Sequence, residues 1–168
     1  MKPNWKGKRV LIIGAARQGL ALARYLSKQG AKVTLNDEQP AENFTNISPE
    51  MKSTGVDCVF GGHPLELLES ADLLSISGGI PLDLPLITAA KNKNLPLTND
   101  SQIFMQSVDA RVIGITGSAG KTTTTTLLGI IATEEMKPPR KAWIGGNIGL
   151  PLVEYLDEIK VEDDVILE

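Results

Sequence analysis

Short apolar runs rich in β-branched residues alternate with helix-like segments along the whole of this 168-residue chain. The runs expected to form strands lie at residues 9–13, 32–36, 57–60, 72–77, 95–98, 112–116 and 164–168. The segments with helical spacing of apolar residues lie at 19–30, 64–70, 84–93, 121–135 and 151–158. Strands that are apolar along their whole length are typical of a parallel sheet covered on both faces. The alternation therefore predicts an α/β fold.

Glycine-bearing turns from a strand into a helix occur twice, at residues 14–19 and 116–123. Because each such turn usually opens a sheet of its own, we expect two α/β domains, with the boundary in SQIFMQSVDA (101–110). The first is a Rossmann-like parallel-sheet domain over residues 1–106, and the second, over residues 107–168, is the first part of a P-loop ATPase-type α/β domain. About 60 residues with two or three strands are too few for a self-sufficient doubly wound domain, so we expect the front part of a longer protein.

Composition argues against several classes of protein. The net charge is −3 and only 4% of residues are aromatic, so the electrostatic footprint of a nucleic-acid-binding protein is missing. No apolar run approaches the roughly 20 residues that span a bilayer, and the N-terminus lacks an apolar signal core. The single cysteine, Cys58, has no partner for an internal disulfide and no metal-ligand spacing, which suits a reducing compartment. We therefore expect a cytoplasmic protein that binds neither nucleic acid nor membrane, and the sequence implies no protein partner.

The segment GITGSAGKTTTTTLLGII (114–131) joins an apolar strand to an apolar helix through a glycine-rich turn. In such a turn, backbone N–H groups and a helix N-terminus cradle phosphate oxygens. Lys121 is expected to place its charge on the β- and γ-phosphates of a nucleotide, and the Thr122 hydroxyl to bind magnesium. The match to G-x-x-x-x-G-K-[ST] is incomplete because Ile115 stands at the first glycine. An ordinary glycine-rich turn capped by threonine, with no ligand, is the alternative.

Five successive threonines follow the lysine, at residues 122–126. Threonine costs up to about 0.7 kcal/mol against alanine inside a helix, so the run costs on the order of 3 kcal/mol of intrinsic preference. We expect two kinds of compensation. The hydroxyls of Thr122 and Thr123 can meet metal and phosphate, and some of residues 124–126 can turn their methyl groups toward the sheet.

The first glycine turn lies in RVLIIGAARQGLALARYL (9–26) and carries a degraded dinucleotide-binding fingerprint. Ala16 replaces the glycine that lets the backbone approach a pyrophosphate, whereas Gly19 keeps close packing of helix on strand. Asp37 ends the next strand, 23 residues beyond the first glycine of the turn. We interpret this as a nucleotide-handling turn, with a purely structural turn as the alternative. Two polar residues at its tip can contact a diphosphate or base, or are merely solvated: Arg17 and Gln18.

Two later glycine pairs and one histidine offer weaker signals. SISGGIP (75–81) ends an apolar strand with two glycines, which allow close approach of the backbone to a ligand, although alone they indicate only a turn. In GGNIGLP (145–151), Asn147 either caps the next helix or contacts a substrate. His63, the only histidine, stands between two glycines and a proline, and we interpret it as a surface or turn residue, with catalysis as the alternative.

GITGSAGKTTTTTLL resembles the ATP loop of the Mur ligases and folylpolyglutamate synthases, whose pattern is T-G-x-x-G-K-[ST]-T. The chain fits that pattern from Thr116 to Thr123, which explains the mismatch to the commoner phosphate-loop motif. The stretches VLIIGAARQG, VTLND, SISGGIP and GGNIGLPL, in this order, further resemble the branch of the Mur ligases that adds D-glutamate. The likeness covers all 168 residues.

The resemblance implies a set of site residues and ligands. ATP would be held by Gly117, Ser118, Ala119, Gly120, Lys121, Thr122 and Thr123, with Lys121 catalytic. UDP-N-acetylmuramoyl-L-alanine would be held by Arg17, Gln18, Asp37, Glu38, Ser77, Gly78, Gly79 and Asn147. Mg²⁺ would be held by Thr122 and Glu168. Glu168 matches the first glutamate of the V-L-E-L-S-S-F-Q-L-E stretch of the family. The family pattern is not followed everywhere: Arg17-Gln18 stand where small pairs are frequent, Gly78 where proline is usual and Ala119 where asparagine is common.

In such ligases the γ-phosphoryl group of ATP passes to the substrate carboxylate, and the amine of an amino acid, here D-glutamate, attacks the acyl phosphate. The resemblance places the amino-acid site and a second metal site outside these residues, so we expect the chain alone to be inactive. The alternatives are another Mur-type or folylpolyglutamate synthase-like ligase, a non-catalytic nucleotide-binding module and an NAD(P)-binding oxidoreductase domain.

Overall fold

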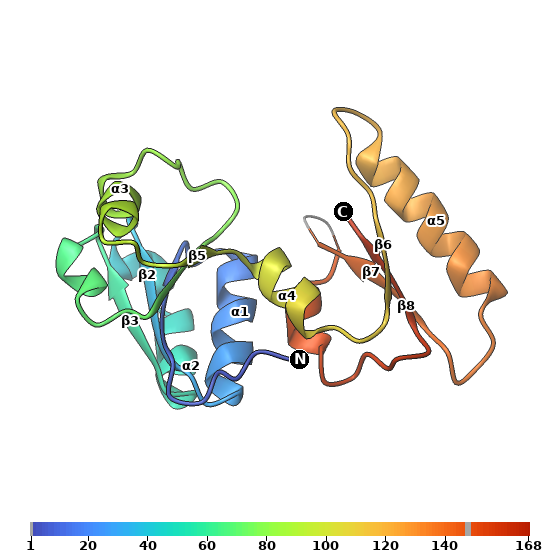
Figure 1. The fold of residues 1–168 in the computed structure, drawn as a ribbon, viewed down its shortest axis with the longest axis horizontal. Coiled ribbons are helices and arrows are strands. Elements are labelled where there is room, and N and C mark those ends of the chain that lie inside the picture. The colour runs from blue at the N-terminus through green and yellow to red at the C-terminus, as the bar shows by residue number, and fades with distance from the viewer. Residues whose placement is uncertain (1, 147–148) are drawn as a thin grey trace. The chain divides into compact units, whose positions relative to one another are not determined.

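The computed structural model describes residues 2–146 and 149–168 and divides into two compact units, Met1–Ile103 and Phe104–Glu168. Each unit has its own parallel sheet, so the predicted α/β class is confirmed (Figure 1). The helix α4, Asp100–Ser107, spans the division. The sequence predicted a linker there. The side chain of Asn99 accepts a hydrogen bond from the Gln102 N–H at 2.8 Å and so caps the start of a helix. The segment contains no glycine or proline that would break this helix.

The sheet of the first unit has five strands in the order β3-β2-β1-β4-β5, and all neighbouring pairs are parallel. The strands are β1 (Arg9–Ile13), β2 (Lys32–Asp37), β3 (Val56–Phe60), β4 (Leu73–Ile76) and β5 (Leu97–Thr98). The helices are α1 (Arg17–Lys28), α2 (Ile47–Ser53) and α3 (Pro85–Asn92), with 3₁₀ turns at η1 (Ala41–Phe44) and η2 (Leu65–Leu68). Because the chain runs from β1 to β2 on one side and returns to β4 on the other, the topological switch point lies between β1 and β4.

Strand β1 forms the centre of this unit because both of its faces are covered. Leu11 and Ile13 pack with residues of η2, β4 and α3 in one buried cluster. Val10 and Ile12, also buried, point to the opposite face, where α1 contacts the sheet. Burial on both faces explains why the strand is apolar throughout. It also fixes the end of the strand, and thus the first glycine turn, firmly in space.

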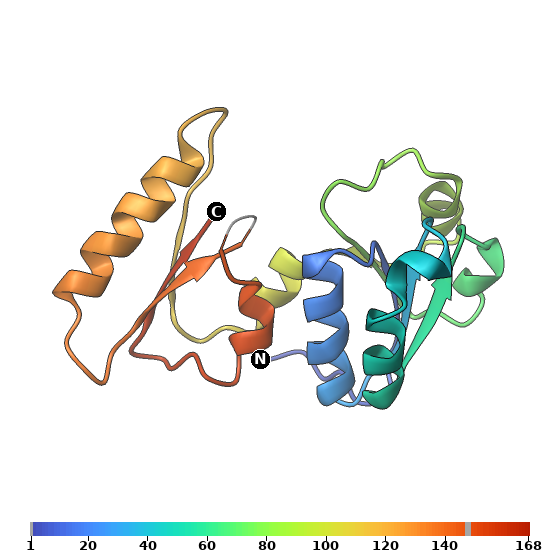
Figure 2. The ribbon, with the colours of Figure 1, turned by 180° about the vertical axis from the view of Figure 1, so that it is seen from behind.

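The second unit has a three-stranded parallel sheet in the order β6-β8-β7. Its elements are β6 (Arg111–Gly114), α5 (Lys121–Glu135), β7 (Ala142–Gly145), the 3₁₀ turn η3 (Leu152–Tyr155) and β8 (Asp164–Leu167). Helix α5 contacts β7 and β8 and lies along the sheet (Figure 2). The predicted helix over 121–135 is confirmed.

Some sequence predictions of elements are wrong. The segments 64–70 and 151–158 form only the single 3₁₀ turns η2 and η3, because a short stretch that begins at a proline does not offset the cost of nucleating a helix. Helix α2 was not predicted, nor was β7. The four residues of β7 include only one β-branched side chain, so their strand depends on pairing with β8.

Two buried aspartates anchor the amino end of β8. The Asp163 carboxylate is 2% exposed and accepts hydrogen bonds from the indole N–H of Trp143 at 2.9 Å and from two backbone amides, those of Lys141 and Lys160. Burial by itself raises the pKa of Asp163, but these three hydrogen bonds outweigh it, so the pKa lies below its usual value. The side chain of Asp164 accepts two hydrogen bonds from Arg111, which chiefly lower the pKa of that carboxyl.

Replacement of Asp163 by alanine is expected to destabilise the second unit by about 3 kcal/mol, because three donors lose their acceptor and each buried unpaired donor costs about 1–3 kcal/mol. Urea unfolding, followed by Trp143 fluorescence in a Trp5→Phe background, measures the change. The exposed neighbour Glu162 supplies the control, since Glu162→Ala should stay within about 0.5 kcal/mol of the parent. Equal stabilities of the two alanine variants would show that Asp163 is not an anchor.

Candidate functional site

The carboxyl edge of the first sheet is tied together by hydrogen bonds between β1 and β2. Gly14, directly after β1, has φ +99° and donates its N–H to the Asn36 carbonyl at 2.8 Å. The next amide, Ala15 N–H, donates to Asp37 Oδ2 at 2.7 Å. The other oxygen of that carboxylate accepts from Gln39 N–H at 3.0 Å. Asp37 therefore closes the glycine turn and holds a negative charge at the edge of the sheet.

The end of β4 meets the same turn at the switch point. The Ser77 N–H donates to the Ile13 carbonyl at 3.0 Å, and its hydroxyl donates to the Gly14 carbonyl at 3.2 Å. Beyond Ser77, Gly78 and Gly79 are exposed, and a Cβ on either would meet no atom within 4 Å. Open backbone at a switch point is where α/β proteins bind ligands.

Helix α1 begins so close to this turn that only glycine fits at its third residue. A Cβ on Gly19 would lie 1.8 Å from the Gly14 carbonyl oxygen and 2.9 Å from Ser77 Oγ. The sequence predicted that Gly19 permits close packing of helix on strand, and this is confirmed. The glycine draws the N-terminus of α1 up to the sheet edge, where the positive end of the helix dipole favours an anion.

The structure thus brings two of the sequence-predicted substrate residues, Asp37 and Ser77, onto one turn. Arg17, at the start of α1, and Glu38, after β2, are exposed at the same edge, whereas Gln18 is half-buried. Asn147 lies outside the described residues. The binding roles of all these residues remain predictions.

Sequence reasoning treated His63 as a turn residue and did not single out Asn36. In the structure, the fully buried Asn36 and the half-buried His63 are joined side chain to side chain, with 2.5 Å between Asn36 Oδ1 and His63 Nδ1. The positions of the two residues in the sequence could have indicated this contact. A polar residue near the end of β2 and one just after β3 must lie at the same edge of a parallel sheet.

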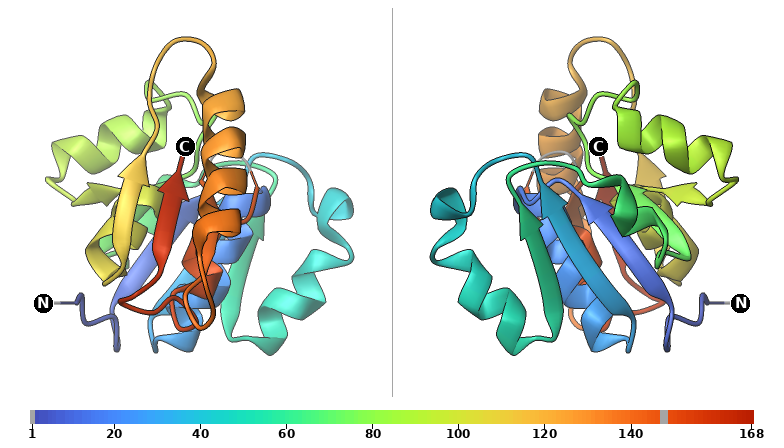
Figure 3. Two further views of the ribbon diagram at one scale, coloured as in Figure 1. Left: turned by 90° about the vertical axis from the view of Figure 1, so that its right-hand side faces the viewer. Right: turned by 90° about the vertical axis from the view of Figure 1, so that its left-hand side faces the viewer.

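The second unit carries the phosphate-type loop at the carboxyl end of β6. In the left view of Figure 3, the loop arches from the end of this strand to the start of α5. Residues 116–120 are exposed, and Gly120, with φ +75°, forms the N-cap of α5. The first bond into the helix runs from Thr124 N–H to the Gly120 carbonyl at 2.9 Å. The amides of residues 121–123 therefore have no acceptor within the helix, which makes this end attractive to anions.

Lys121 folds back over this loop, and its ammonium group donates to the Gly117 carbonyl at 2.8 Å. Of the five threonines after it, only Thr125 is buried, at 0% exposed, so one of residues 124–126 faces the sheet as expected. A Cβ on Gly129, one turn further on, would lie 2.3 Å from Ile144 Cδ1. The helix therefore sits tightly on β7, which holds the loop in place.

Glu168, directly after β8, lies at the sheet edge that carries the loop. The end of β8 is bonded to the loop through Ile115 N–H and the Leu167 carbonyl at 2.7 Å, and Glu168 N–H donates to the Gly145 carbonyl at 3.0 Å. Glu168 Oε2 is buried and has no hydrogen-bond partner within residues 2–146 and 149–168. A buried carboxylate oxygen without a donor is costly unless a cation or a donor pairs with it. The same residues contain no cluster of three or more His, Cys, Asp or Glu side chains for a metal, but Mg²⁺ commonly takes one or two protein oxygens and completes its shell with phosphate and water.

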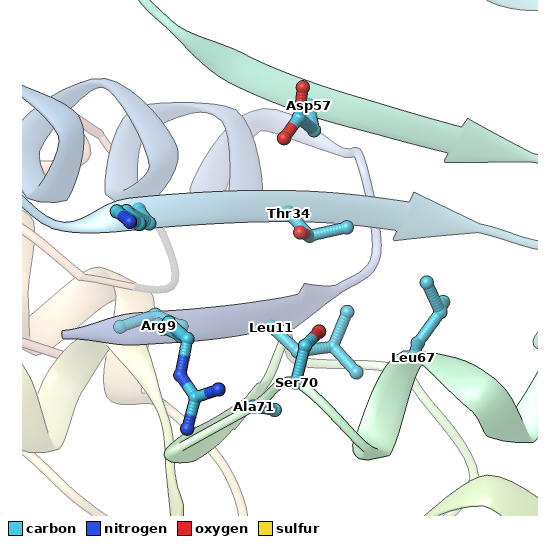
Figure 4. A pocket seen from close by; sticks show the side chains of 9 residues that line it. Arg9, Leu11, Thr34, Asp57, Leu67, Ser70 and Ala71 are labelled. Carbon is cyan, nitrogen blue, oxygen red and sulfur yellow. The ribbon is translucent and has the colours of Figure 1, made fainter.

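A pocket of about 190 Å³ lies elsewhere on the first unit (Figure 4). It spans the amino-terminal halves of β1 and β2 and the segment after η2, and none of the sequence-predicted site residues lines it. Arg9, at its rim, is already paired with Asp72, whose pKa this guanidinium holds well below the usual range, first through a side-chain hydrogen bond. The sequence-predicted site residues within the described part of the chain lie instead at the carboxyl edges of the two sheets. No helix within the described part of the chain has the length and apolar character needed to cross a membrane.

The two units define an α/β protein with two parallel sheets. A switch point of the kind that binds ligands lies at the carboxyl edge of the first sheet, and a loop of the kind that binds phosphate lies at that of the second. Residues 8–99 match the family model described as "Mur ligase MurD-like, N-terminal domain". The chain belongs to this family.

Curated proteins of similar sequence support the same family assignment. The chain is 36% identical over 168 residues to the UDP-N-acetylmuramoylalanine–D-glutamate ligase of Ligilactobacillus salivarius, covering 100% of this chain and 36% of that protein. It is 40% identical over 167 residues to the enzyme of the same name from Bacillus thuringiensis, covering 98% and 36%. The chain thus spans about a third of the length of these curated relatives.

Solved structures show the same fold. A pseudomurein peptide ligase type C from Methanothermus fervidus aligns with a TM-score of 0.54 and 26% identity, over 96% of this chain and 33% of that one. A UDP-N-acetylmuramate:L-alanyl-gamma-D-glutamyl-meso-diaminopimelate ligase from Neisseria meningitides aligns with a TM-score of 0.59 and 22% identity, over 96% and 52%.

Proposed function

We propose that this chain supplies the UDP-substrate-binding domain, residues 1–106, and the start of the ATP-binding domain, residues 107–168, of a cytoplasmic ligase of peptidoglycan synthesis. The reaction adds D-glutamate to UDP-N-acetylmuramoyl-L-alanine at the expense of ATP. One observation carries the proposal. A lysine folds over a glycine-rich loop at a helix N-terminus, and nearby a buried carboxylate oxygen has no partner among the described residues. The relatives of the chain bear the name of this ligase.

The second unit would bind and orient the ATP phosphates. The open amides of α5 and the Lys121 ammonium, released from the Gly117 carbonyl, would take the phosphate oxygens. The other loop residues, Ser118, Ala119 and Gly120, would offer exposed backbone, and Thr123 a second hydroxyl. Thr122 and Glu168 would hold Mg²⁺, whose charge helps neutralise the phosphates.

Such chemistry needs charge neutralisation and orientation rather than a nucleophile from the protein. A substrate carboxylate oxygen bonds to the γ-phosphorus and ADP leaves. The amine of D-glutamate then bonds to the acyl carbon, and phosphate and a proton leave. Lys121 and the amides would act at the first step, where negative charge passes to the oxygen that bridges the β- and γ-phosphates of ATP and leaves with ADP.

The first unit would hold the UDP part of the substrate along its carboxyl edge. The N-terminus of α1, with Arg17 and Gln18 in its first turn, suits the diphosphate, and the open backbone of Gly78 and Gly79 lets a ligand approach the switch point. Asp37, with Glu38 next to it, suits the nucleoside, because an acidic residue at the end of the second strand commonly accepts from a ribose hydroxyl. Asn147 is proposed from the resemblance alone to face the reacting end of the substrate.

Calorimetry of the 168-residue chain with UDP, ATP·Mg²⁺ and NAD(H) tests the assignment of the two edges. We expect binding of UDP and of ATP·Mg²⁺, and none of NAD(H). Binding of NAD(H) without UDP would instead indicate an oxidoreductase domain. The complete ligase, supplied with UDP-N-acetylmuramoyl-L-alanine, ATP and a panel of amino acids, should turn over with D-glutamate, whereas the 168-residue chain alone should form no amide. Preference for another amino acid would assign the chain to a different Mur ligase.

A further inference from the structure

The side chain of Asn36 sits where β2 and β3 end together. The register pairs Asn36 with Val59 and Asp37 with Phe60, so the turn after β3 lies beside the edge that holds Asp37. Asn36 is 0% exposed, and its Nδ2 donates to the carbonyls of Val59 and Gly62, both at 2.8 Å. Both amide hydrogens are therefore used, and the amide cannot be turned around, because two carbonyl oxygens would then face Oδ1.

These two bonds fix which tautomer a neutral His63 ring adopts. The remaining polar atom of Asn36, Oδ1, is an acceptor and lies 2.5 Å from His63 Nδ1. Two acceptors do not pair, so Nδ1 carries the hydrogen. In the neutral ring, Nε2 then presents a lone pair in a fixed direction. Within the part of the chain that the structure describes, Nε2 has no hydrogen-bond partner.

The turn itself does not require this arrangement. Gly61 N–H already donates to the carbonyls of Asp37 at 3.2 Å and Gln39 at 2.9 Å, which bind the turn to the end of β2. A fully buried asparagine with every polar atom engaged, coupled to a half-buried ring, instead resembles the support that orients a functional imidazole.

The position of His63 along the edge identifies what it meets. In a nucleotide bound across such a sheet, the diphosphate lies at the first turn and the ribose at the end of the second strand. The nucleoside therefore extends past Asp37 toward the end of β3. We propose that His63 Nε2 accepts a hydrogen bond from the nucleoside of the UDP-bearing substrate, and that Asn36 is the residue that positions it. This inference rests on the proposed function, because it needs the nucleotide at this edge.

Two substitutions at His63 separate the bond to the substrate from the bond to Asn36. In His63→Asn, the new amide nitrogen can take the place of Nδ1 and keep the bond to Asn36, but nothing reaches the place of Nε2. In His63→Gln, the longer side chain can offer an oxygen near Nε2 but loses the donor at Nδ1. Calorimetry of the 168-residue chain with UDP and with CDP gives affinities, and thermal unfolding gives stability.

We expect His63→Asn to unfold at the temperature of the parent and to bind UDP about tenfold more weakly, as loss of one hydrogen bond predicts. His63→Gln should unfold earlier and keep part of the affinity. Uracil has an N–H donor at N3 where cytosine has an acceptor. If His63→Asn loses affinity for UDP but not for CDP, the group that donates to His63 is on the base. If it loses affinity equally for both nucleotides, that group is on the ribose.

Unchanged UDP affinity in His63→Asn would overturn the inference while leaving the proposed function intact. Failure of the parent chain to bind UDP would overturn both. Should His63→Asn not fold, the ¹⁵N chemical shift of Nε2 in the parent decides: acceptance of a hydrogen bond moves it upfield when UDP is added, and a constant shift in the UDP-saturated chain would refute the contact.

Discussion

Replacing Lys121 by alanine is expected to lower the kcat of the complete ligase by about 10²–10³-fold, the usual cost of removing one group that stabilises charge in the transition state. In the structure, the ammonium group lies over the loop, 2.8 Å from the Gly117 carbonyl, and is within reach of phosphates held there. Rates of ADP release with UDP-N-acetylmuramoyl-L-alanine and D-glutamate measure the effect.

Lys137, exposed beyond the end of α5, provides a control of equal charge. Lys137→Ala should turn over at the parental rate, so general loss of positive charge does not explain the result. Binding of UDP to the first unit should be unaffected by either substitution. Near-normal turnover of Lys121→Ala would remove the phosphate loop from the mechanism.

Introducing a single methyl group at Gly19 is expected to be the most damaging small change in the first unit. The Cβ of Gly19→Ala would lie 1.8 Å from the Gly14 carbonyl oxygen, a backbone atom held by the turn. Relief requires α1 to move away from the sheet, at a cost of about 3 kcal/mol or more. The movement also opens the candidate nucleotide edge, so affinity for UDP should fall together with the free energy of unfolding.

Gly78 is the matched control, since a Cβ there would meet no atom within 4 Å. Gly78→Ala should leave the free energy of unfolding within about 0.5 kcal/mol of the parent, as for other uncrowded surface sites. Urea unfolding of both variants makes the comparison. If Gly19→Ala were as stable as Gly78→Ala, the close approach of helix to strand would not be a constraint on this fold.

The candidate loop was the most predictable part of the molecule. Glycines, lysine and threonine between a strand and a helix specify local backbone geometry, and the helix over 121–135 begins where the sequence indicates. The short elements were harder. Strand β7 and helix α4 carry weak local signals, and they form because β8 and the cap of Asn99 supply the bonds that their own residues do not indicate.

The alternation of apolar runs and glycine turns determined by itself that the chain folds into parallel sheets with turns suited to phosphate, because strand burial and turn geometry are local or periodic properties. Only the tertiary structure decided which side chains meet at the edges. Asp37 closes a turn 22 residues earlier in the chain, and Asn36 orients a histidine 27 residues later. Such contacts depend on strand order and register, which the spacing of residues along one segment does not specify.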